Sequence, residues 1–125
     1  SGPLLDRIDL YVEMRRLKKE EIFNDEVSET SEKVRERVIK ARKIQKKRYN
    51  SDLLNAKMNR RQISRYCKIN EDTKKIFEKA IDELQLSVRM YDKVLKVSRT
   101  IADLDNSENI ETVHLLEALN YRKKY

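Results

Sequence analysis

The first residue placed for chemistry is Arg89, which lies two positions after Ser87. The short hydroxyl side chain of Ser87 is typical of the residue that caps the start of a helix. A cation in the first turn of that helix opposes the helix dipole, at a cost on the order of 0.3 to 1 kcal/mol where it is exposed. A phosphate group bound there would be stabilised by the free N–H groups, the dipole and the guanidinium together. The alternative is an ordinary salt bridge between Arg89 and a nearby carboxylate such as Asp92.

A second arginine, Arg7, stands after a Gly-Pro turn signal, at the entry to a strand predicted over residues 8–14. An arginine at the end of a sheet suits a finger that reaches into a neighbouring subunit and stabilises charge on a transferring phosphoryl group. The alternative is an exposed arginine paired with Asp6 or Asp9.

The net charge of +7 is concentrated in the middle of the chain. Residues 28–68 hold 14 basic and 4 acidic side chains, whereas residues 1–27 hold 5 and 7, and residues 69–125 hold 10 and 11. Such a segment could attract nucleic acid, because phosphate neutralisation supplies most of the sequence-independent affinity. The alternative is a solvated helix face.

Two tyrosines accompany the arginines of this basic segment. Arg61 and Arg65, together with Tyr49 and Tyr66, would form a basic surface with aromatic rings on which bases stack. The alternative is that both tyrosines pack at the ends of helices.

Helices must position these residues. One glycine and one proline in 125 residues leave no material for glycine-rich phosphate loops or for the many tight turns of a β-sandwich. Charged residues make up 41% and hydrophobic residues 38% of the chain. The apolar side chains are therefore enough for the core of one modest domain with a tail, and too few for two independent cores. No uncharged run is long enough for a membrane span or a signal peptide, so we expect a cytoplasmic protein without a membrane partner. A single cysteine, Cys67, and a single histidine, His114, predict no metal site within the chain.

Caps and apolar periodicity predict an all-α body of four to five helices. Ser28, Thr30 or Ser31 would cap a long helix that runs to about Tyr49 and packs along one narrow stripe. Asn70, followed by two acidic residues, starts another helix. Its predicted broad core-facing stripe consists of Thr73, Ile76, Phe77, Ala80, Ile81 and Leu84. A loop is expected over residues 55–59, followed by a short helix over about 60–67. The helix over 87–104 is expected to be the most buried one, and a last helix ends near residue 122.

Residues 8–14 alternate apolar and polar side chains, as in a strand that is buried on one face. It is the only strand pattern in the sequence, and a single strand cannot satisfy its own backbone hydrogen bonds. We therefore expect the rest of its sheet to lie elsewhere, and we interpret the chain as a piece of a larger protein.

Four blocks of sequence are recognisable together. They are Ser-Gly-Pro-Leu-Leu-Asp-Arg-Ile-Asp-Leu at 1–10, Leu-Asn-Ala-Lys-Met at 54–58, Leu-Ser-Val-Arg at 86–89 with Arg-Thr-Ile-Ala-Asp-Leu at 99–104, and His-Leu-Leu-Glu-Ala-Leu-Asn-Tyr-Arg at 114–122. In this order, over nearly the whole chain, they resemble the C-terminal part of magnesium-chelatase-like AAA+ ATPases. The resemblance is greatest to the bacterial competence-associated branch, whose members remodel branched DNA.

The resemblance implies a hexameric ATPase that holds ATP and Mg²⁺ between subunits and between a core and a helical lid. Residues 1–27 would be the end of the AAA+ core, one strand and a connector that are irregular in isolation, and residues 28–125 would be the lid. Arg7 matches the arginine finger that acts on ATP held by the neighbour. Arg89 matches the sensor 2 arginine, which reaches the terminal phosphates. The Walker A loop and the acidic magnesium-holding motif are not in this sequence, so we expect neither ATP hydrolysis nor a bound cofactor from it alone.

The sequence departs from the family's pattern at two places. Gln85 stands where relatives tend to have glycine, so the turn before the Leu-Ser-Val-Arg block must form without glycine's freedom at positive φ. Arg60 and Arg61 replace a common Ser-Gly, and the added charge favours a polyanion contact. Together with Arg65 they are the candidate nucleic-acid residues.

Three functions stay open from the sequence. The chain is interpreted first as the lid of a DNA-remodelling motor, whose partners are its own AAA+ core, identical subunits and DNA. The second interpretation is an autonomous nucleic-acid-binding module built on residues 28–68, and the third is a chelatase motor in porphyrin metallation. Two remaining residues have structural interpretations: Cys67 as a small buried apolar residue, and His114 as a helix-surface or lid-packing residue.

Overall fold

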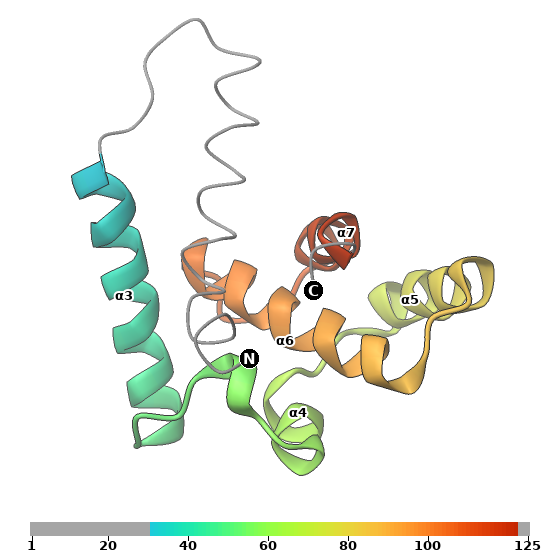
Figure 1. Ribbon diagram of the computed structural model, residues 1–125, viewed down its shortest axis with the longest axis horizontal. Coiled ribbons are helices and arrows are strands. Elements are labelled where there is room, and N and C mark those ends of the chain that lie inside the picture. Colours follow the sequence, from blue (N-terminus) through green and yellow to red (C-terminus); the bar gives the residue numbers. More distant parts are fainter. Residues whose placement is uncertain (1–30, 123–125) are drawn as a thin grey trace, which may run out of the picture.

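The computed structural model describes residues 31–122, which fold into five α-helices and one short 3₁₀ helix (Figure 1). These elements are α3 (Ser31–Tyr49), η1 (Asn55–Lys57), α4 (Arg60–Tyr66), α5 (Glu71–Leu84), α6 (Val88–Leu104) and α7 (Thr112–Asn120). No strand occurs within residues 31–122, and the all-α prediction is confirmed for that range. The strand expected over residues 8–14 and the domain boundary expected after residue 27 lie outside the described residues.

Helix α6 is the centre of the domain, and α3, η1, α4 and α7 all pack against it (Figure 1). From Val94 to Leu104 every side chain except that of Lys96 is buried. A helix that is buried around most of its circumference must be covered on several sides. The prediction of the most buried helix is therefore confirmed.

Helix α3 packs through the narrow stripe that the sequence predicts. Val34, Ala41 and Gln45 are buried and Val38 is half-buried, while most of the cations between them are exposed. Although α3 has 19 residues, neither it nor any other helix in the described range is long and apolar enough to cross a bilayer.

Helix α5 begins as predicted but buries less than predicted. The side chain of Asn70 accepts a hydrogen bond from the N–H of Thr73 at 2.8 Å, which confirms the cap. The predicted stripe is narrower than expected: Ala80 and Ile81 pack against the core, but Ile76 and Leu84 are 39% and 41% exposed. Thr73 and Phe77 alone are buried in this helix. The reason is that α5 lies at the edge of the domain, where other helices cover it on one side only (Figure 1).

His114 fixes the start of α7. Its Nδ1 accepts a hydrogen bond from the backbone N–H of Glu111 at 2.9 Å, and its Nε2 lies 3.1 Å from Oδ2 of Asp105. Because a backbone N–H can only donate, the ring carries its proton on Nε2 and donates it to the carboxylate. The side chain is buried, so the packing role of His114 is the one that the structure shows.

A buried carboxylate, that of Asp103, joins α3, η1 and α6. It accepts hydrogen bonds from both terminal nitrogens of Arg48, from Nδ2 of Asn55 at 2.9 Å and from Nε of Arg99 at 3.2 Å. The side chain of Asp103 is completely buried, and those of Arg99 and Arg48 are only 5% and 16% exposed. Buried charges are tolerated when they are paired and hydrogen-bonded, and here two guanidiniums and an amide surround one carboxylate.

The contacts of Asp103 show that the loop expected over residues 55–59 is wrong. Residues 55–57 form η1 instead, and Asn55 and Ala56 are buried. Asn55 must approach α6 to reach Asp103, and the hydroxyl of Tyr49 donates to its Oδ1 at 2.6 Å. A polar residue that carries so many buried contacts cannot lie in a solvated loop.

Arg99 extends the network to the connection between α6 and α7. Its Nη1 and Nη2 donate to the carbonyls of Glu108 and Ser107 at 3.0 and 2.9 Å. Burial alone lowers the pKa of Arg48, but the hydrogen bond and the negative charge of Asp103 outweigh it, so the pKa of Arg48 is raised. Burial is the main cause that lowers the pKa of Arg99, against the attraction of Asp103. Both arginines remain protonated, because a guanidinium does not lose its proton in proteins.

We expect Asp103→Asn to lower the free energy of unfolding by about 3 to 5 kcal/mol, because two buried guanidiniums lose their counter-charge. Urea unfolding followed by circular dichroism measures this change. Asp52→Asn is the matched control, since Asp52 and Lys46 are 3.6 Å apart with side chains that are 92% and 73% exposed. An exposed pair of this kind contributes less than about 1 kcal/mol. Equal losses in the two variants would contradict a central role for Asp103.

Candidate phosphate-sensing site and the neighbouring hollow

The turn between α5 and α6 determines where α6 starts. Gln85 adopts φ 52° and ψ 50°, the left-handed conformation that favours glycine. The N–H of Leu86 donates to the carbonyl of Ile81 at 3.1 Å, as in a Schellman motif, and both side chains pack against the core. The expectation that this turn forms without glycine is confirmed, at a conformational cost of about 1 to 2 kcal/mol.

The start of α6 presents Arg89 to solvent. The hydroxyl of Ser87 accepts a hydrogen bond from the N–H of Met90 at 3.1 Å, which confirms Ser87 as the cap. The first turn contains no acidic residue, and Arg89 is exposed. Within residues 31–122 its guanidinium has no hydrogen bond or ion pair. An unpaired cation and the positive end of a helix dipole therefore lie together, which is an arrangement that attracts anions.

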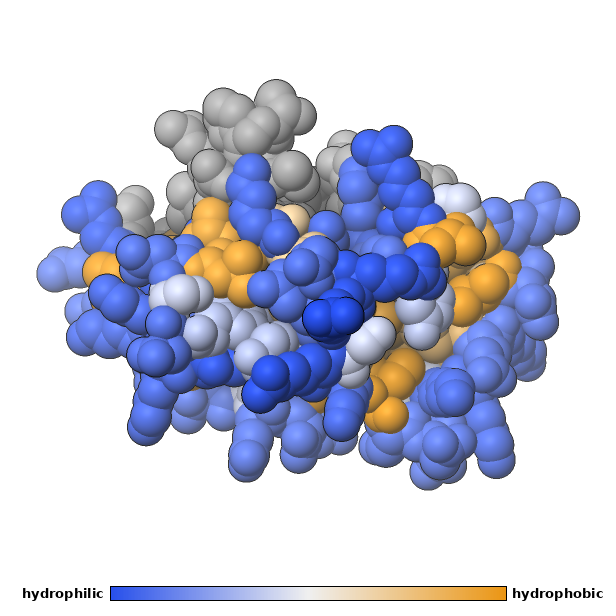
Figure 2. All heavy atoms as spheres, turned by 90° about the horizontal axis from the view of Figure 1, so that it is seen from below, coloured by the Kyte–Doolittle hydropathy of each residue, from blue (hydrophilic) through white to orange (hydrophobic). Residues whose placement is uncertain are grey.

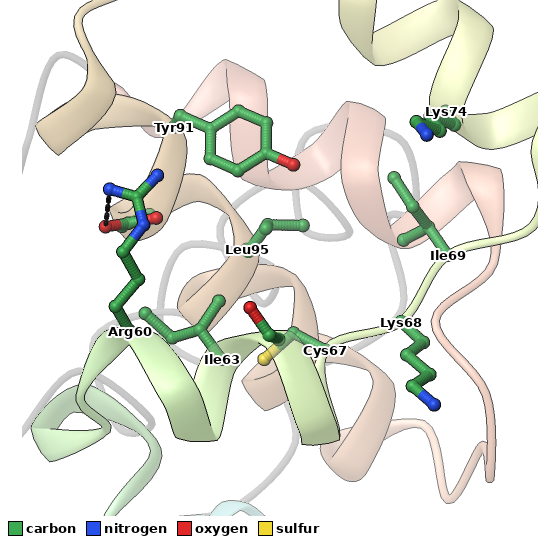
Figure 3. Close-up of a pocket in the computed structure, with 10 residues that line it drawn as sticks. Arg60, Ile63, Cys67, Lys68, Ile69, Lys74, Tyr91 and Leu95 are labelled. Atoms are coloured by element: carbon green, nitrogen blue, oxygen red, sulfur yellow. Dashed lines mark ion pairs between the residues drawn. The ribbon is translucent and has the colours of Figure 1, made fainter.

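The partner considered for Arg89 from the sequence, Asp92, is engaged elsewhere. Nη1 of Arg60 lies 3.8 Å from Oδ2 of Asp92, and this ion pair joins the start of α4 to α6 (Figure 3). The salt bridge between Arg89 and Asp92 does not occur in the described part of the chain. Arg60, a candidate nucleic-acid residue, is thus the one arginine of α4 that contacts α6 through a charge.

A hollow of about 280 Å³ lies beside this ion pair, where α4, the connection to α5, and α6 meet (Figure 3). Its apolar lining includes Ile63, Ile69 and Leu95. Its basic lining consists of Arg60, Lys68 and Lys74. Sequence reasoning missed this hollow, because its residues come from separate elements and form no motif along the chain.

Helix α4 lies on the side of the domain that is at the bottom of Figure 1. Figure 2 shows that side, where hydrophilic side chains cover most of the surface. Arg60, Arg61 and Arg65 are all exposed. The rings of Tyr49 and Tyr66 instead pack edge to face, with centroids 4.8 Å apart, and both lie against the core. Packing at helix ends is therefore the role that the structure shows for these tyrosines.

The structure does not bring all five arginines that the sequence singled out into one site. Arg89 begins α6, and the three α4 arginines belong to a different helix. Arg7 lies outside the described residues. The exposed helix start and the basic surface of α4 are therefore two separate features.

The resemblance found in the blocks at 54–58, 86–89, 99–104 and 114–122 is supported by comparison with known proteins. The family described as "Magnesium chelatase, subunit ChlI C-terminal" matches residues 28–122. The chain belongs to this family.

Individual relatives of this magnesium-chelatase C-terminal domain agree with the family match. Competence protein ComM of Haemophilus influenzae is 47% identical over 123 residues, and the proteins named YifB of Escherichia coli and Salmonella typhimurium are 41% and 40% identical over 124 residues. Each match covers 98% of this chain and 24% of the relative. The chain thus spans about a quarter of the length of these curated relatives. The predicted resemblance to the competence-associated branch is confirmed.

Cys67 lies in the wall of the hollow and is buried, as predicted. Burial raises the pKa of its thiol to about 12, although the charges of Arg99 and Arg48 act in the opposite direction. Burial likewise raises the pKa of the Tyr49 hydroxyl to about 12. In this magnesium-chelatase C-terminal domain Cys67 is a protonated, unreactive residue at neutral pH.

We expect the contribution of Cys67 to the free energy of unfolding to fall as the pH rises above 9, while the lowered pKa of Lys96 acts in the opposite direction. The Cys67 thiol ionises near pH 9 in the unfolded chain and near pH 12 in the folded one, so between these values the folded state binds more protons. The loss is at most about 1.4 kcal/mol per pH unit, and Tyr49 adds to it above pH 10. Urea unfolding at pH 8, 9 and 10 measures the fall. Cys67→Ala should remove most of the change between pH 9 and 10, and an unchanged fall in that variant would exclude the thiol as its cause.

Proposed function

We propose that this domain is the lid of an AAA+ ATPase, in which Arg89 acts as the sensor 2 arginine. In such a motor the nucleotide lies between the core and the lid, and a lid arginine reaches the terminal phosphates. The observation that carries the proposal is the exposed guanidinium of Arg89 at the start of α6, which has no partner within residues 31–122. Membership of the magnesium-chelatase family supports it.

The start of α6 offers three kinds of group to a phosphate. The first four N–H groups of an α-helix have no partner within the helix, and Ser87 accepts only one of them, from Met90. The helix dipole adds a partial positive charge. The planar guanidinium of Arg89 can donate two hydrogen bonds to phosphate oxygens, which the point charge of a lysine cannot match.

These groups make the lid sensitive to the nucleotide state. Without an anion, Arg89 opposes the helix dipole and the start of α6 is electrostatically unfavourable. A bound triphosphate removes this penalty and favours closure of the lid on the core. Loss of the terminal phosphate restores the penalty, because fewer oxygens are left to accept hydrogen bonds. The lid therefore reports hydrolysis through a change in local charge.

The remaining parts of the proposal concern the parent protein. ATP and Mg²⁺ would be held by the AAA+ core of the same chain, and Arg7 would act as a finger on ATP bound by the neighbour in a hexamer. DNA is the proposed substrate of the motor. Support comes from the exposed cations of α3 and α4, and from a relative that is named a competence protein.

Two other functions have specific support. The basic residues of α3 and α4 favour an autonomous nucleic-acid-binding module, and the family description favours a chelatase motor in porphyrin metallation. The module would bind nucleic acid with a steep dependence on salt and would not need Arg89. The chelatase motor would share the lid mechanism and differ in what it acts on.

We expect Arg89→Ala in the full-length parent protein to slow ATP hydrolysis by about 100-fold or more, because a preorganised phosphate donor is lost. Arg89→Lys should give an intermediate rate, since it keeps the charge and loses the planar fork. Arg35→Ala is the matched control, because Arg35 is also an exposed helical arginine. Circular dichroism checks that each variant is folded. An unchanged rate in folded Arg89→Ala would overturn the sensor 2 role.

The same ATPase assay tests the substrate when single-stranded or branched DNA is added. Strong stimulation supports a motor that acts on DNA. Hydrolysis without stimulation contradicts the DNA substrate and favours the chelatase motor. Tight DNA binding by the 125-residue chain, combined with a normal rate in Arg89→Ala, favours the autonomous module.

A further inference from the structure

We infer that the hollow between α4, α5 and α6 binds one nucleotide of a single-stranded nucleic acid, with the base inside the hollow and the phosphate beside Lys74. This inference deepens the proposed action on DNA and rests on it. It gives a role to Tyr91 and Lys74, which neither the Arg89 site nor the arginines of α4 require.

The interior of the hollow suits a flat ring with polar edges. Leu95 and Ile69 supply apolar walls, and the hydroxyl of Tyr91 points over the space (Figure 3). The Tyr91 ring is stacked on Phe77, with centroids 4.8 Å apart and 7° between the planes. The ring is therefore held in place before any ligand arrives. Aromatic and aliphatic walls of this kind are the usual contacts of bases in single strands.

The size of the hollow limits the ligand. Its volume of about 280 Å³ lies just below the roughly 300 to 1,000 Å³ of pockets that enclose drug-sized molecules. A single base with part of its sugar fits this space, and a complete nucleoside triphosphate does not. The phosphates of the ligand must then lie at the rim, where the cations are.

The rim of the hollow carries an excess of positive charge. Asp92 is the one acidic residue in the lining, and Arg60 is paired with it at 3.8 Å. Lys68 and Lys74 are exposed and have no partner among residues 31–122. In Figure 3 the Lys74 ammonium lies at the edge of the hollow, whereas that of Lys68 points away from it. An unpaired ammonium group beside a partly apolar hollow complements a ligand that joins an apolar ring to a phosphate.

The hollow is separate from the proposed ATP contact. At about 100° per residue, Tyr91 and Leu95 lie about 200° and 240° around α6 from Arg89. A phosphate on Arg89 and a base in the hollow would therefore approach α6 from different sides. The two ligands can bind at the same time.

The hollow also continues into the basic surface of α4. Ser64 lines the hollow, and the exposed Arg61 and Arg65 flank it in the sequence of the same helix. A strand with one base in the hollow would meet these cations with its neighbouring phosphates. Cations spaced one turn apart on a helix can each meet a phosphate of the same strand, which favours a nucleic-acid strand over a single acidic group.

Fluorescence anisotropy of a labelled oligothymidine of about 12 nucleotides tests the inference on the 125-residue chain. Lys74→Ala should weaken binding and reduce the slope of log affinity against log salt by about 0.7, the value for one phosphate contact in a single strand. Lys75→Ala is the matched control, because Lys75 is also exposed on α5 and does not line the hollow. It should leave the slope unchanged.

A second variant separates the base from the phosphate. Ser64→Phe fills the hollow without changing any charge, so affinity should fall by about five-fold or more while the salt slope stays the same. Ser64→Ala controls for loss of the hydroxyl and should bind normally. Nuclear magnetic resonance adds a direct readout, since the amide signals of Tyr91 and Leu95 should shift when the oligothymidine is added.

Three outcomes would overturn the inference. Equal effects of Lys74→Ala and Lys75→Ala would show diffuse attraction to the basic surface alone. Displacement of the strand by a polyglutamate peptide as effectively as by unlabelled oligothymidine would show an acidic-peptide site. Stronger binding of free thymidine monophosphate than of the strand would identify a small-molecule site.

These readouts do not depend on ATP hydrolysis. If the parent ATPase ignores DNA while the Lys74→Ala and Ser64→Phe effects are observed, the proposed action on DNA fails and the hollow remains a nucleotide site. If DNA stimulates the ATPase while both variants bind normally, the hollow inference fails and the proposed function stands.

Discussion

The domain depends on one buried carboxylate, that of Asp103. Two guanidiniums and one amide donate to it, from α3, η1 and α6 itself. Arg99 also donates hydrogen bonds to two backbone carbonyls in the segment before α7. Removing any member would leave a buried charge or donor without its partner, which is costly in a dry interior. This set of contacts joins α3, η1 and α6 to the segment before α7, next to the hydrophobic core that the helices share.

The two ends of α6 differ in burial and in electrostatic environment, as the proposed sensor 2 role requires. Its C-terminal half is buried and anchored by Asp103, whereas its first turn is exposed and carries unfavourable features. Gln85 is held at positive φ, and Arg89 lies beside the positive end of the dipole without a partner in the described range. The C-terminal half of α6 is therefore stabilised by buried contacts, whereas its first turn carries locally unfavourable backbone and charge arrangements. Such unfavourable arrangements are common where a protein binds a ligand.

Burial separates the arginines that stabilise the fold from those that are exposed on the surface. Arg48 and Arg99 face inward and stabilise the fold, while Arg61 and Arg65 face solvent. Arg60 belongs to both groups, since it is exposed and still connects α4 to α6 through Asp92. A count of basic residues in the segment 28–68 therefore overstates the charge that is free to attract a polyanion, because part of it neutralises carboxylates within the domain.

The sequence by itself determined where α5 and α6 begin and which helix is central. Asn70 and Ser87 cap helices through bonds to residues three positions away, so the signal is contained in a short stretch of chain. Family membership also followed from contiguous blocks of residues. The tertiary structure alone decided the Asp103 network, the incomplete burial of α5, and the hollow beside Tyr91. These features join residues as distant as Arg48 and Asp103, 55 positions apart, and periodicity along one helix does not reveal which other helix covers it.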